Sequence, residues 1–273
     1  MKKLRRTFKA IIEILKNPWL LNRILEDDGI WAKDIKKKYD RNAAFPIVDL
    51  ANFLPDSRES LETFAFQGGG SLPTDLALLK GLSKRIAASN YFEIGTWRGE
   101  SVANVADTGA DCYTLDLSKE KLKAMKVDKI YAQLHGYFSG ERDNITYLYG
   151  DSKTFDFEGL NKKFDLIFID GDHHYEFVKN DTERVFEHLL HDKTIVVWHD
   201  YAYTPEKVRP EVMAGILDGV PEKFRHCLYH VSNTMCAIFT RESLEITAPD
   251  FPVVPDKKFR VEIGIQKIAI KTP

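Results

Sequence analysis

The stretch YFEIGTWRGES, from Tyr91 to Ser101, decides the fold of this chain. A short apolar strand runs into a turn with two glycines, Gly95 and Gly99, and then into the start of a helix. Glycine lets the backbone pass close to a ligand, and the first turn of a helix presents free N–H groups and a positive dipole end to the same space. The stretch therefore predicts a strand, turn and helix at which a nucleotide-like cofactor binds. A purely structural turn has the same residues and stays as the alternative.

The spacing of the glycines distinguishes between kinds of cofactor. The chain has GxxxG after Glu93 and lacks the GxGxxG that cradles a dinucleotide pyrophosphate. A cofactor with an amino acid tail and one ribose needs fewer N–H donors and a nearby carboxylate. Asp116 ends the next apolar run, about 20 residues downstream, where related sheets place a ribose-binding acid. Ser118 and a helix follow directly, so Asp116 also fits a helix N-cap, and the two roles are compatible.

The rest of the chain alternates between strand-like and helix-like periods. Strands are expected at Tyr91 to Gly95, Cys112 to Leu117, Ile145 to Tyr149, Asp165 to Asp170 and Thr194 to His199. Helices are expected near Ser101, near Lys119, at Thr74 to Ala88, at Tyr175 to Leu190 and at Glu206 to Leu217. Two more strands, Phe224 to Val231 and Thr234 to Thr240, are joined by two residues and must form a hairpin. The pattern predicts an α/β fold with a seven-stranded, mostly parallel sheet and one antiparallel hairpin strand.

Three regions follow from this pattern. Residues 1–64 read as a helical N-terminal appendage rich in Lys and Arg, residues 65–241 as the α/β domain, and residues 242–273 as a tail. The apolar alternation VEIGIQKIAI in the tail predicts an edge strand or a cover for the sheet. The run Gly68 to Gly70 is interpreted as a linker, with the edge of a lid as the alternative.

Composition narrows the class of protein. A net charge of -2 and a pI near 6.5 give no overall attraction for nucleic acid, so no nucleic-acid partner is expected. The three cysteines sit in apolar runs without metal-binding spacing, which predicts core thiols in the reducing cytoplasm. The first helix is basic and then apolar, but Glu13 and Lys16 interrupt it, so neither an export signal nor a transmembrane segment is expected. Packing of this helix on the domain and peripheral contact with a membrane both stay open, as does a homo-oligomer.

Polar residues gather where three of the predicted strands end. These clusters are Gly150-Asp151-Ser152, Asp170-Gly171-Asp172-His173-His174 and His199-Asp200-Tyr201. Any one of them is also typical of ordinary turns and caps. In an open parallel sheet, ligands bind beyond the carboxyl ends of the strands. Three clusters at that edge, beside the glycine turn, therefore predict one shared site.

Together the motifs resemble the class I S-adenosylmethionine-dependent methyltransferases. The motifs that carry the resemblance are EIGTWRGES, CYTLDLS, GDS, FDLIFIDGDHHYE and VVWHDY. Within that class the pairing of DGDHxYE with HDY is similar to the macrocin-type sugar O-methyltransferases. The resemblance covers roughly Ala65 to Arg241 and implies a Rossmann-like fold.

The resemblance implies roles for individual residues. The implied cofactor residues are Glu93, Gly95, Thr96 and Gly99 at the methionine end, Asp116 at the ribose, Asp151 and Ser152 at the adenine, and Asp170. The implied ligands of a divalent cation, Mg²⁺ or Mn²⁺, are Asp170, His199 and Asp200. Some relatives carry an acid where this chain has His199, and the nitrogen ligand favours Mn²⁺, Fe²⁺ or Zn²⁺ over a purely oxygen-ligated Mg²⁺. Asp172 is the implied general base, with His173 as its competitor.

The chemistry of methyl transfer gives an independent reason for such groups. A sulfonium methyl donor is already activated, so the enzyme must mainly align the acceptor and make its hydroxyl a better nucleophile. A cation lowers the pKa of a coordinated hydroxyl, and a carboxylate or imidazole takes the proton. Without a metal, His173 or His199 becomes the favoured base, because imidazole titrates near neutral pH.

The sequence thus predicts an O-methyltransferase acting on a small acceptor such as a sugar or a glycosylated metabolite. A nicotinamide oxidoreductase lacks support without GxGxxG, and a nucleic-acid methyltransferase lacks the Asn/Asp-Pro-Pro-aromatic loop after its fourth strand. A non-catalytic cofactor-binding or scaffolding protein of the same fold stays as the main alternative, because fold does not prove activity.

Overall fold

The structure is a computed structural model that describes residues 2–21, 27–54, 58–140, 142–249 and 252–268. An eight-stranded sheet forms its centre, in the order β1-β9-β10-β6-β5-β2-β3-β4. The strands are β1 (Ile47–Val48), β2 (Asn90–Ile94), β3 (Asp111–Asp116), β4 (Ile145–Tyr149), β5 (Phe164–Ile169), β6 (Leu190–Trp198), β9 (Leu228–Val231) and β10 (Ala237–Phe239). Every pairing is parallel except those of β10, which runs antiparallel to both β6 and β9. The mostly parallel sheet with one antiparallel hairpin strand is confirmed.

The sheet has one strand more than expected. Residues Ile47 and Val48 pair in parallel with His230 and Val231, so β1 extends the sheet beyond β9. Thr247 forms an isolated antiparallel bridge with Ile47. The expected appendage and the expected tail therefore both reach the sheet. A strand of two residues is too short to show a period of two, which is why the sequence did not predict it.

Helices cover both faces of the sheet. The α-helices are α1 (Lys2–Lys16), α3 (Asp28–Tyr39), α4 (Pro73–Arg85), α5 (Glu100–Ala106), α6 (Lys119–Ala124), α7 (Lys129–Gln133), α8 (Tyr175–His188) and α9 (Pro210–Gly219). The described residues also form short 3₁₀ helices, η1 (Leu50–Phe53), η3 (Glu158–Leu160) and η4 (Glu222–Cys227). Phe92 and Ile167 pack in one core with α8 and α9, whereas their neighbours Tyr91 and Phe168 pack in a second core with α4 and α5. Both faces are buried, as is usual for parallel sheets.

Several local predictions differ from the structure. Residues Phe224 to Cys227 form η4 instead of the start of a strand, because a 3₁₀ turn begins after Pro221. The helix expected from Glu206 begins at Pro210, and a small hairpin, β7 (Ala202–Thr204) and β8 (Lys207–Val208), precedes it. Helix α7 was not predicted.

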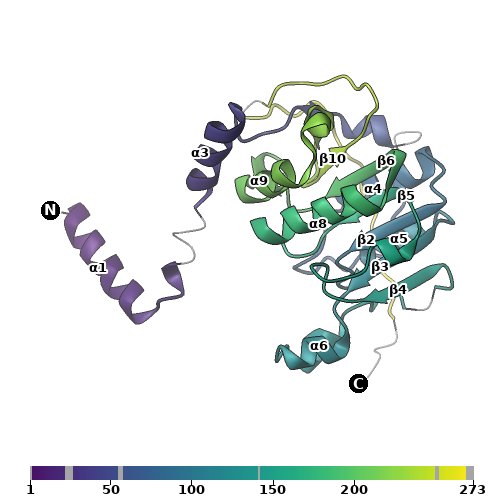
Figure 1. Ribbon diagram of the computed structural model, residues 1–273, viewed down its shortest axis with the longest axis horizontal. Helices are drawn as coiled ribbons and strands as arrows, with labels where there is room; N and C mark the ends of the chain where they lie inside the picture. The colour runs from purple at the N-terminus through teal and green to yellow at the C-terminus, as the bar shows by residue number, and fades with distance from the viewer. Residues whose placement is uncertain (1, 22–26, 55–57, 141, 250–251, 269–273) are drawn as a thin grey trace.

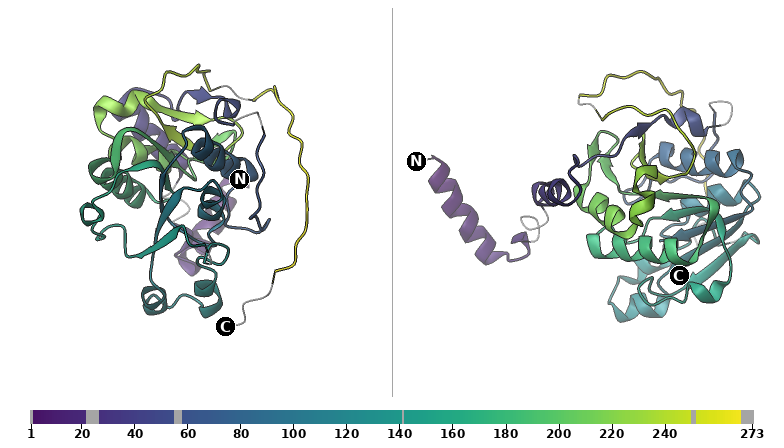
Figure 2. Two further views of the ribbon diagram at one scale, coloured as in Figure 1. Left: turned by 90° about the vertical axis from the view of Figure 1, so that its right-hand side faces the viewer. Right: turned by 45° about the horizontal axis from the view of Figure 1, so that its top comes forward.

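The predicted edge strand of the tail is wrong for the residues that can be checked. Residues 252–268 contain no strand, and Figure 2 shows them as an extended trace along the outside of the body. The last two residues of the alternation, 269 and 270, lie outside the described residues.

Helix α1 lies apart from the body in Figure 1, and no residue of it is buried. Across the described part of the chain, no helix is both long enough and apolar enough to cross a membrane.

Candidate active site at the carboxyl ends of the strands

Backbone hydrogen bonds fasten the loops of the site to one edge of the sheet. Each joins a residue just after one strand to the end of a neighbouring strand. The four bonds are Gly95 N to Leu115 O (2.9 Å), Gly150 N to Asp116 O (3.0 Å), Asp170 N to Ile94 O (2.8 Å) and His199 N to Ile169 O (3.0 Å). The glycine turn and the three polar clusters therefore start side by side, as the parallel order predicts.

Only glycine fits two positions of the glycine turn. Gly95 has φ of 95°, and a Cβ there would lie 2.0 Å from the carbonyl oxygen of Asp170. Gly99 has φ of 78° at the N-cap of α5, and its Cβ would lie 2.0 Å from Oγ of Ser139. The turn is packed tightly against the loop after β5 and against a segment that follows α7. Both approaches remove the room for any side chain.

Glu93 lies inside the protein instead of at an open surface. Its carboxylate accepts hydrogen bonds from Tyr91 Oη (2.7 Å) and Thr114 Oγ1 (3.0 Å), and Thr114 also bonds the hydroxyl of Thr96. Burial raises the pKa of Glu93 to about 8, although hydrogen bonds from Ser101, Tyr91 and Thr114 act in the opposite direction. Glu93 and Thr96 thus tie β2 and the glycine turn to β3.

Asp116 already has a partner at its carboxylate. Oδ2 lies 2.6 Å from Nδ1 of His135, and Oδ1 accepts the backbone N–H of Leu117. If Nδ1 donates this bond, Nε2 of a neutral His135 is left as an acceptor. Nε2 of His135 and Nε1 of Trp97 are both buried, and neither has a hydrogen-bond partner among the described residues. The rings of Trp97, Tyr131 and His135 contact one another beside Asp116.

The loop after β4 is organised by the backbone and by helix α8. Asp151 caps a turn, since its Oδ1 accepts from Lys153 N and its carbonyl accepts from Thr154 N. Ser152 donates a hydrogen bond to Asp181, a buried acid of α8. Burial raises the pKa of Asp181 to about 6, although hydrogen bonds from Ser152 and Asn180 lower it. Asp181 therefore links the predicted adenine loop to α8.

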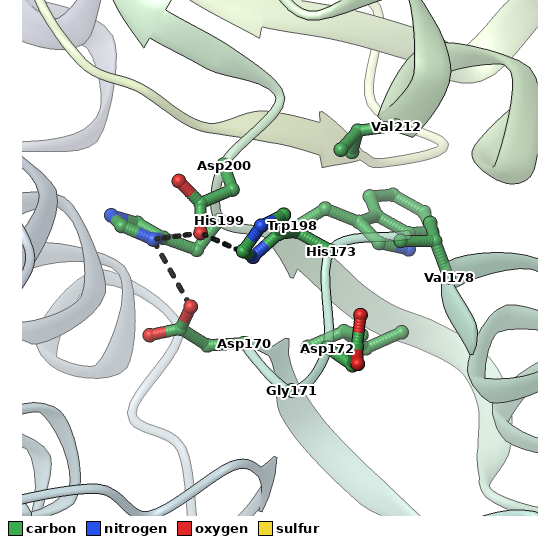
Figure 3. A pocket seen from close by; sticks show the side chains of 10 residues that line it. Asp170, Gly171, Asp172, His173, Val178, Trp198, His199, Asp200 and Val212 are labelled. Carbon is green, nitrogen blue, oxygen red and sulfur yellow. Dashed lines mark ion pairs between the residues drawn. The ribbon is translucent and has the colours of Figure 1, made fainter. Parts of the chain in front are cut away.

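The three predicted metal ligands come together. One ligand atom from each of Asp170, His199 and Asp200 lies within 4.8 Å of the others. Nδ1 of His199 is 3.0 Å from Oδ1 of Asp170 and 3.6 Å from Oδ2 of Asp200, and Figure 3 shows the three side chains turned toward one another. Asp200 has φ of 55°, a left-handed conformation that is uncommon for a residue other than glycine.

A fourth residue, Asp75 of α4, holds the histidine from behind. Its Oδ2 lies 3.1 Å from Nε2 of His199 and accepts the backbone N–H of Leu72, while its Oδ1 accepts the N–H of Met235. Asp75 is completely buried. In a His199 that carries one proton, on Nε2 toward Asp75, the Nδ1 lone pair would face Asp170 and Asp200. This arrangement of carboxylate, imidazole and metal is common behind metal-bound histidines.

Carboxylate groups outnumber the basic groups in this cluster, so a bound cation would reduce its negative charge. Burial lowers the pKa of His199, but Asp170, Asp200 and Asp75 outweigh that effect and raise it well above its ordinary value. Burial raises the pKa of Asp170, against the opposing charge of His199. For Asp200, burial raises the pKa, but the hydrogen bond and charge of His199 outweigh it and the pKa is lowered. Three acids, Asp75, Asp170 and Asp200, stand against the imidazole of His199 and the guanidinium of Arg209, which lies 3.7 Å from Oδ1 of Asp200. Negative charge is still in excess, so a divalent cation fits the cluster.

The two predicted proton acceptors lie in the same pocket. The pocket is lined by Ile169, Asp170, Gly171, Asp172, His173, Val178, Trp198, His199, Asp200 and Val212 (Figure 3). Oδ1 of Asp172 accepts the backbone N–H of His174 (2.9 Å) and bonds Nδ1 of the same residue. Burial raises the pKa of Asp172, but the hydrogen bonds from His174 outweigh it and the pKa is lowered. Nδ1 of His173 is 3.9 Å from Oδ2 of Asp200.

Sequence reasoning missed three acids and bases that the fold brings to the site. Asp75 and Asp181 stand on helices, at positions where an acid is typical of a cap or of an exposed face. His135 lies in a segment that showed no motif. The signal that could have found Asp75 is its place three residues after Leu72 at a helix start, but that pattern predicts a capping role only.

A comparison with protein families finds one match in the part of the chain that carries this site. Residues 92–201 match a family model described as a methyltransferase domain, which is less than half of the chain. The matched segment runs from the glycine turn to the cluster after β6. This match agrees with the resemblance of the segment to the class I methyltransferases. The macrocin-type branch stays a prediction. No curated protein matches the chain.

Solved structures of low sequence identity were also found. An SAH-bound methyltransferase of Podospora anserina is 17% identical, with 71% of this chain and 85% of that chain covered and a TM-score of 0.43. An O-methyltransferase of Bacillus cereus in complex with SAH is 18% identical, with coverage of 64% and 84% and a TM-score of 0.45. A putative O-methyltransferase of Klebsiella pneumoniae is 18% identical, with the same coverage and a TM-score of 0.44. At these values the superpositions do not define an activity or a substrate.

Proposed function

We propose that this protein is an S-adenosylmethionine-dependent O-methyltransferase that uses a divalent cation and acts on a hydroxyl of a small acceptor, such as a sugar or a glycosylated metabolite. The observation that carries the proposal is the cluster of Asp170, His199 and Asp200 at the same strand edge as the glycine turn, inside a methyltransferase domain. Methyl donor, cation and acceptor would all meet at this edge.

The residues around Asp116 fit the proposed cofactor. Among the described residues, Trp97 Nε1 and His135 Nε2 are buried polar atoms without hydrogen-bond partners. His135 bonds the carboxylate of Asp116, which we expect to bind ribose hydroxyls, and the ring of Trp97 contacts that of His135. Gly95 and Gly99 let the glycine turn adopt positive φ and pack against Asp170 and Ser139. When bound, the cofactor supplies a methyl group already activated on a sulfonium. The chain would hold its ribose with Asp116 and its adenine with the loop of Asp151 and Ser152.

The metal cluster fits a cation that accepts both oxygen and nitrogen ligands. Asp170 and Asp200 offer carboxylate oxygens, His199 offers Nδ1, and Asp75 fixes the orientation of the imidazole. This donor set suits Mn²⁺ better than Mg²⁺, which prefers oxygen alone. A cation bound there lowers the pKa of a hydroxyl that coordinates it.

The proton of the acceptor hydroxyl has two candidate destinations. Asp172 is ionised over the working pH range, since its pKa is lowered, and a weak base of this kind accepts a proton only from a hydroxyl that is already acidified. His173 lies beside Asp200 in the same pocket and is the competitor. We propose Asp172 as the base when the cation is bound.

Calorimetric titration with S-adenosylmethionine tests the cofactor assignment. Replacement of Asp116 by Ala removes the ribose contact and should weaken binding by about 2 kcal/mol, or roughly thirtyfold, as expected for a lost hydrogen bond to a charged group. Asp111→Ala is the matched control, because Asp111 is an exposed acid at the opposite end of the same strand. Equal binding by both variants and the parent protein would refute the assignment.

Turnover with hydroxylated acceptors tests the metal and separates the alternative function. Methylation should stop after chelation and return with Mn²⁺. A protein that binds the cofactor but methylates no hydroxyl under any metal condition would instead be the non-catalytic binding protein kept as the alternative.

A further inference from the structure

Helix α1 exposes an apolar face that the rest of the described chain does not cover. It is 15 residues long, and none of its residues is buried. Four large apolar side chains are strongly exposed: Leu4 at 78%, Phe8 at 68%, Ile11 at 49% and Leu15 at 75%. Figure 1 and the right-hand view of Figure 2 both place α1 away from the sheet and the helices that cover it. Packing on the domain, the usual reason for an amphipathic helix, is therefore not what this face does.

The apolar residues of α1 form one continuous stripe. Leu4, Phe8, Ile11 and Leu15 are spaced by four, three and four residues, so they lie on one side of the helix over three turns. Ile12 widens the stripe. Trp19 follows shortly after the helix, and its side chain is 58% exposed. Tryptophan is favoured at the boundary between acyl chains and headgroups, because its ring is apolar and its N–H is polar.

The other side of α1 is strongly basic. Lys2, Lys9 and Lys16 are spaced by seven and lie opposite the apolar stripe, with Arg5 and Arg6 among them. Six basic residues, Lys3 included, stand against a single acid, Glu13, whereas the whole protein has a net charge of -2. The helix is therefore positive and the remainder of the chain is negative.

We infer that α1 docks on an anionic lipid surface. The helix would lie in the plane of the membrane, with the apolar stripe in the boundary of the acyl chains and the basic residues among negatively charged headgroups. Its length of about 22 Å, at 1.5 Å per residue, is too short to cross a bilayer. This charge complementarity selects an anionic membrane over α1 of a second copy, which would carry the same positive charge. The inference does not depend on the methyltransferase activity.

Vesicle flotation with the full chain tests the inference. The parent protein should float with vesicles of phosphatidylglycerol mixed with phosphatidylcholine, and it should bind vesicles of phosphatidylcholine alone much more weakly. Phe8→Glu should reduce the vesicle-bound fraction by roughly tenfold or more, because it removes an aromatic side chain that would enter the membrane and adds a negative charge near anionic headgroups. Arg5→Gln combined with Arg6→Gln should reduce binding and make it less sensitive to salt. Val254→Glu is the matched control, since Val254 is 80% exposed but lies far along the chain.

The outcomes show whether the apolar stripe of α1 binds a membrane or a second copy of the chain. Loss of flotation in the α1 variants, with normal flotation of Val254→Glu, supports the inference. Failure of the parent protein to bind anionic vesicles overturns it, as does binding that Phe8→Glu leaves unchanged. Sedimentation of the same proteins without lipid gives the last check. A parent dimer that Phe8→Glu turns into monomers, without any vesicle binding, would assign the stripe to a second copy and also overturn the inference.

Discussion

Asp75 is the residue whose role depends most on the proposed metal. Asp75→Asn replaces one oxygen by an NH₂ group, so the contact with Nε2 of His199 no longer fixes the proton on that nitrogen. We expect Mn²⁺ affinity to fall by roughly 10- to 100-fold, as is typical when the partner of a metal-bound histidine is removed. Titration of Mn²⁺ followed by electron paramagnetic resonance measures this directly.

The chain offers a close control for that variant. Asp165 bonds Nε2 of His191 at 3.0 Å, the same kind of contact, near the start of β5 and away from the cluster. Asp165→Asn should leave Mn²⁺ affinity unchanged. If both variants lower it equally, the effect of Asp75 is on general stability and its positioning role is wrong.

Gly95 is the glycine at which we expect an added methyl group to lower the stability of the protein most. In Gly95→Ala the new Cβ would need to displace the carbonyl of Asp170, whereas Gly109→Ala has a similar φ of 89° and open space around it. The control variant should lose about 1 kcal/mol of unfolding free energy from the backbone conformation alone. Gly95→Ala should lose roughly 2 kcal/mol more and bind the cofactor poorly. Urea unfolding of both variants compares them, and similar losses would contradict the close approach.

At the residue scale, the sequence predicted the side chains that follow strands and missed those that reach the site from helices. Asp170, His199 and Asp200 could be found because parallel strands end at one edge, and the structure brings them together. Asp75 lies more than a hundred residues before His199, and no local pattern relates the two. The burial of Glu93 also depends on packing that no motif records.

At the element scale, the segment from α7 to Gly140 forms one wall of the proposed cofactor site. His135 contacts Asp116, and the N–H groups of Gly136 and Phe138 bond the carbonyls of Trp97 and Arg98. Bound S-adenosylhomocysteine should therefore slow amide hydrogen exchange in residues 134–140, because it would stabilise this wall. Exchange in α9 should not change. Protection that appears in α9 alone would place the ligand elsewhere.

Helix α8 should make the stability of the protein depend on pH through Asp181. Its pKa is raised from 3.8 to about 6 in the folded state, so folding binds the proton more tightly. The stabilising contribution is complete below about pH 4 and is lost as the pH rises through about 6. Asp181→Asn removes this dependence. Relative to the parent protein, the free energy of unfolding of the variant should therefore rise by roughly 1 to 3 kcal/mol when the pH is raised from 4 to 7. Denaturant unfolding of both proteins at pH 4 and pH 7 measures this change. If the two unfolding free energies differ by the same amount at both pH values, Asp181 does not have the raised pKa of a buried acid.

Elements with a clear period were predictable and very short ones were not. The prediction matched β4 at both ends and β2, β3 and β5 to within one residue at each end, because each is a compact apolar run. The two-residue strands β1 and β8 carry no period, and their pairing depends on distant partners. In the tail, apolar alternation is present, but residues 252–268 pair with neither of the outer strands, β1 and β4.

At the scale of the whole molecule, α1 and the body should be energetically independent. Removing residues 1–21 takes away no buried side chain of α1, so the melting temperature should not change. Val48→Asp should lower it clearly, because Val48 is completely buried in the second core. Differential scanning calorimetry compares the two variants. A large drop on truncation would mean that α1 contributes to the fold.

The pairing of β1 with β9 also constrains how the protein is made. Ile47 leaves the ribosome long before its partner His230. The outermost strand, β1, therefore stays unpaired while nearly all of the sheet is synthesised. Such a late, long-range closure is slow to form and exposes apolar surface in the meantime. A nascent chain that stops before residue 231 should therefore depend on a chaperone, and completion of the last hairpin should release it.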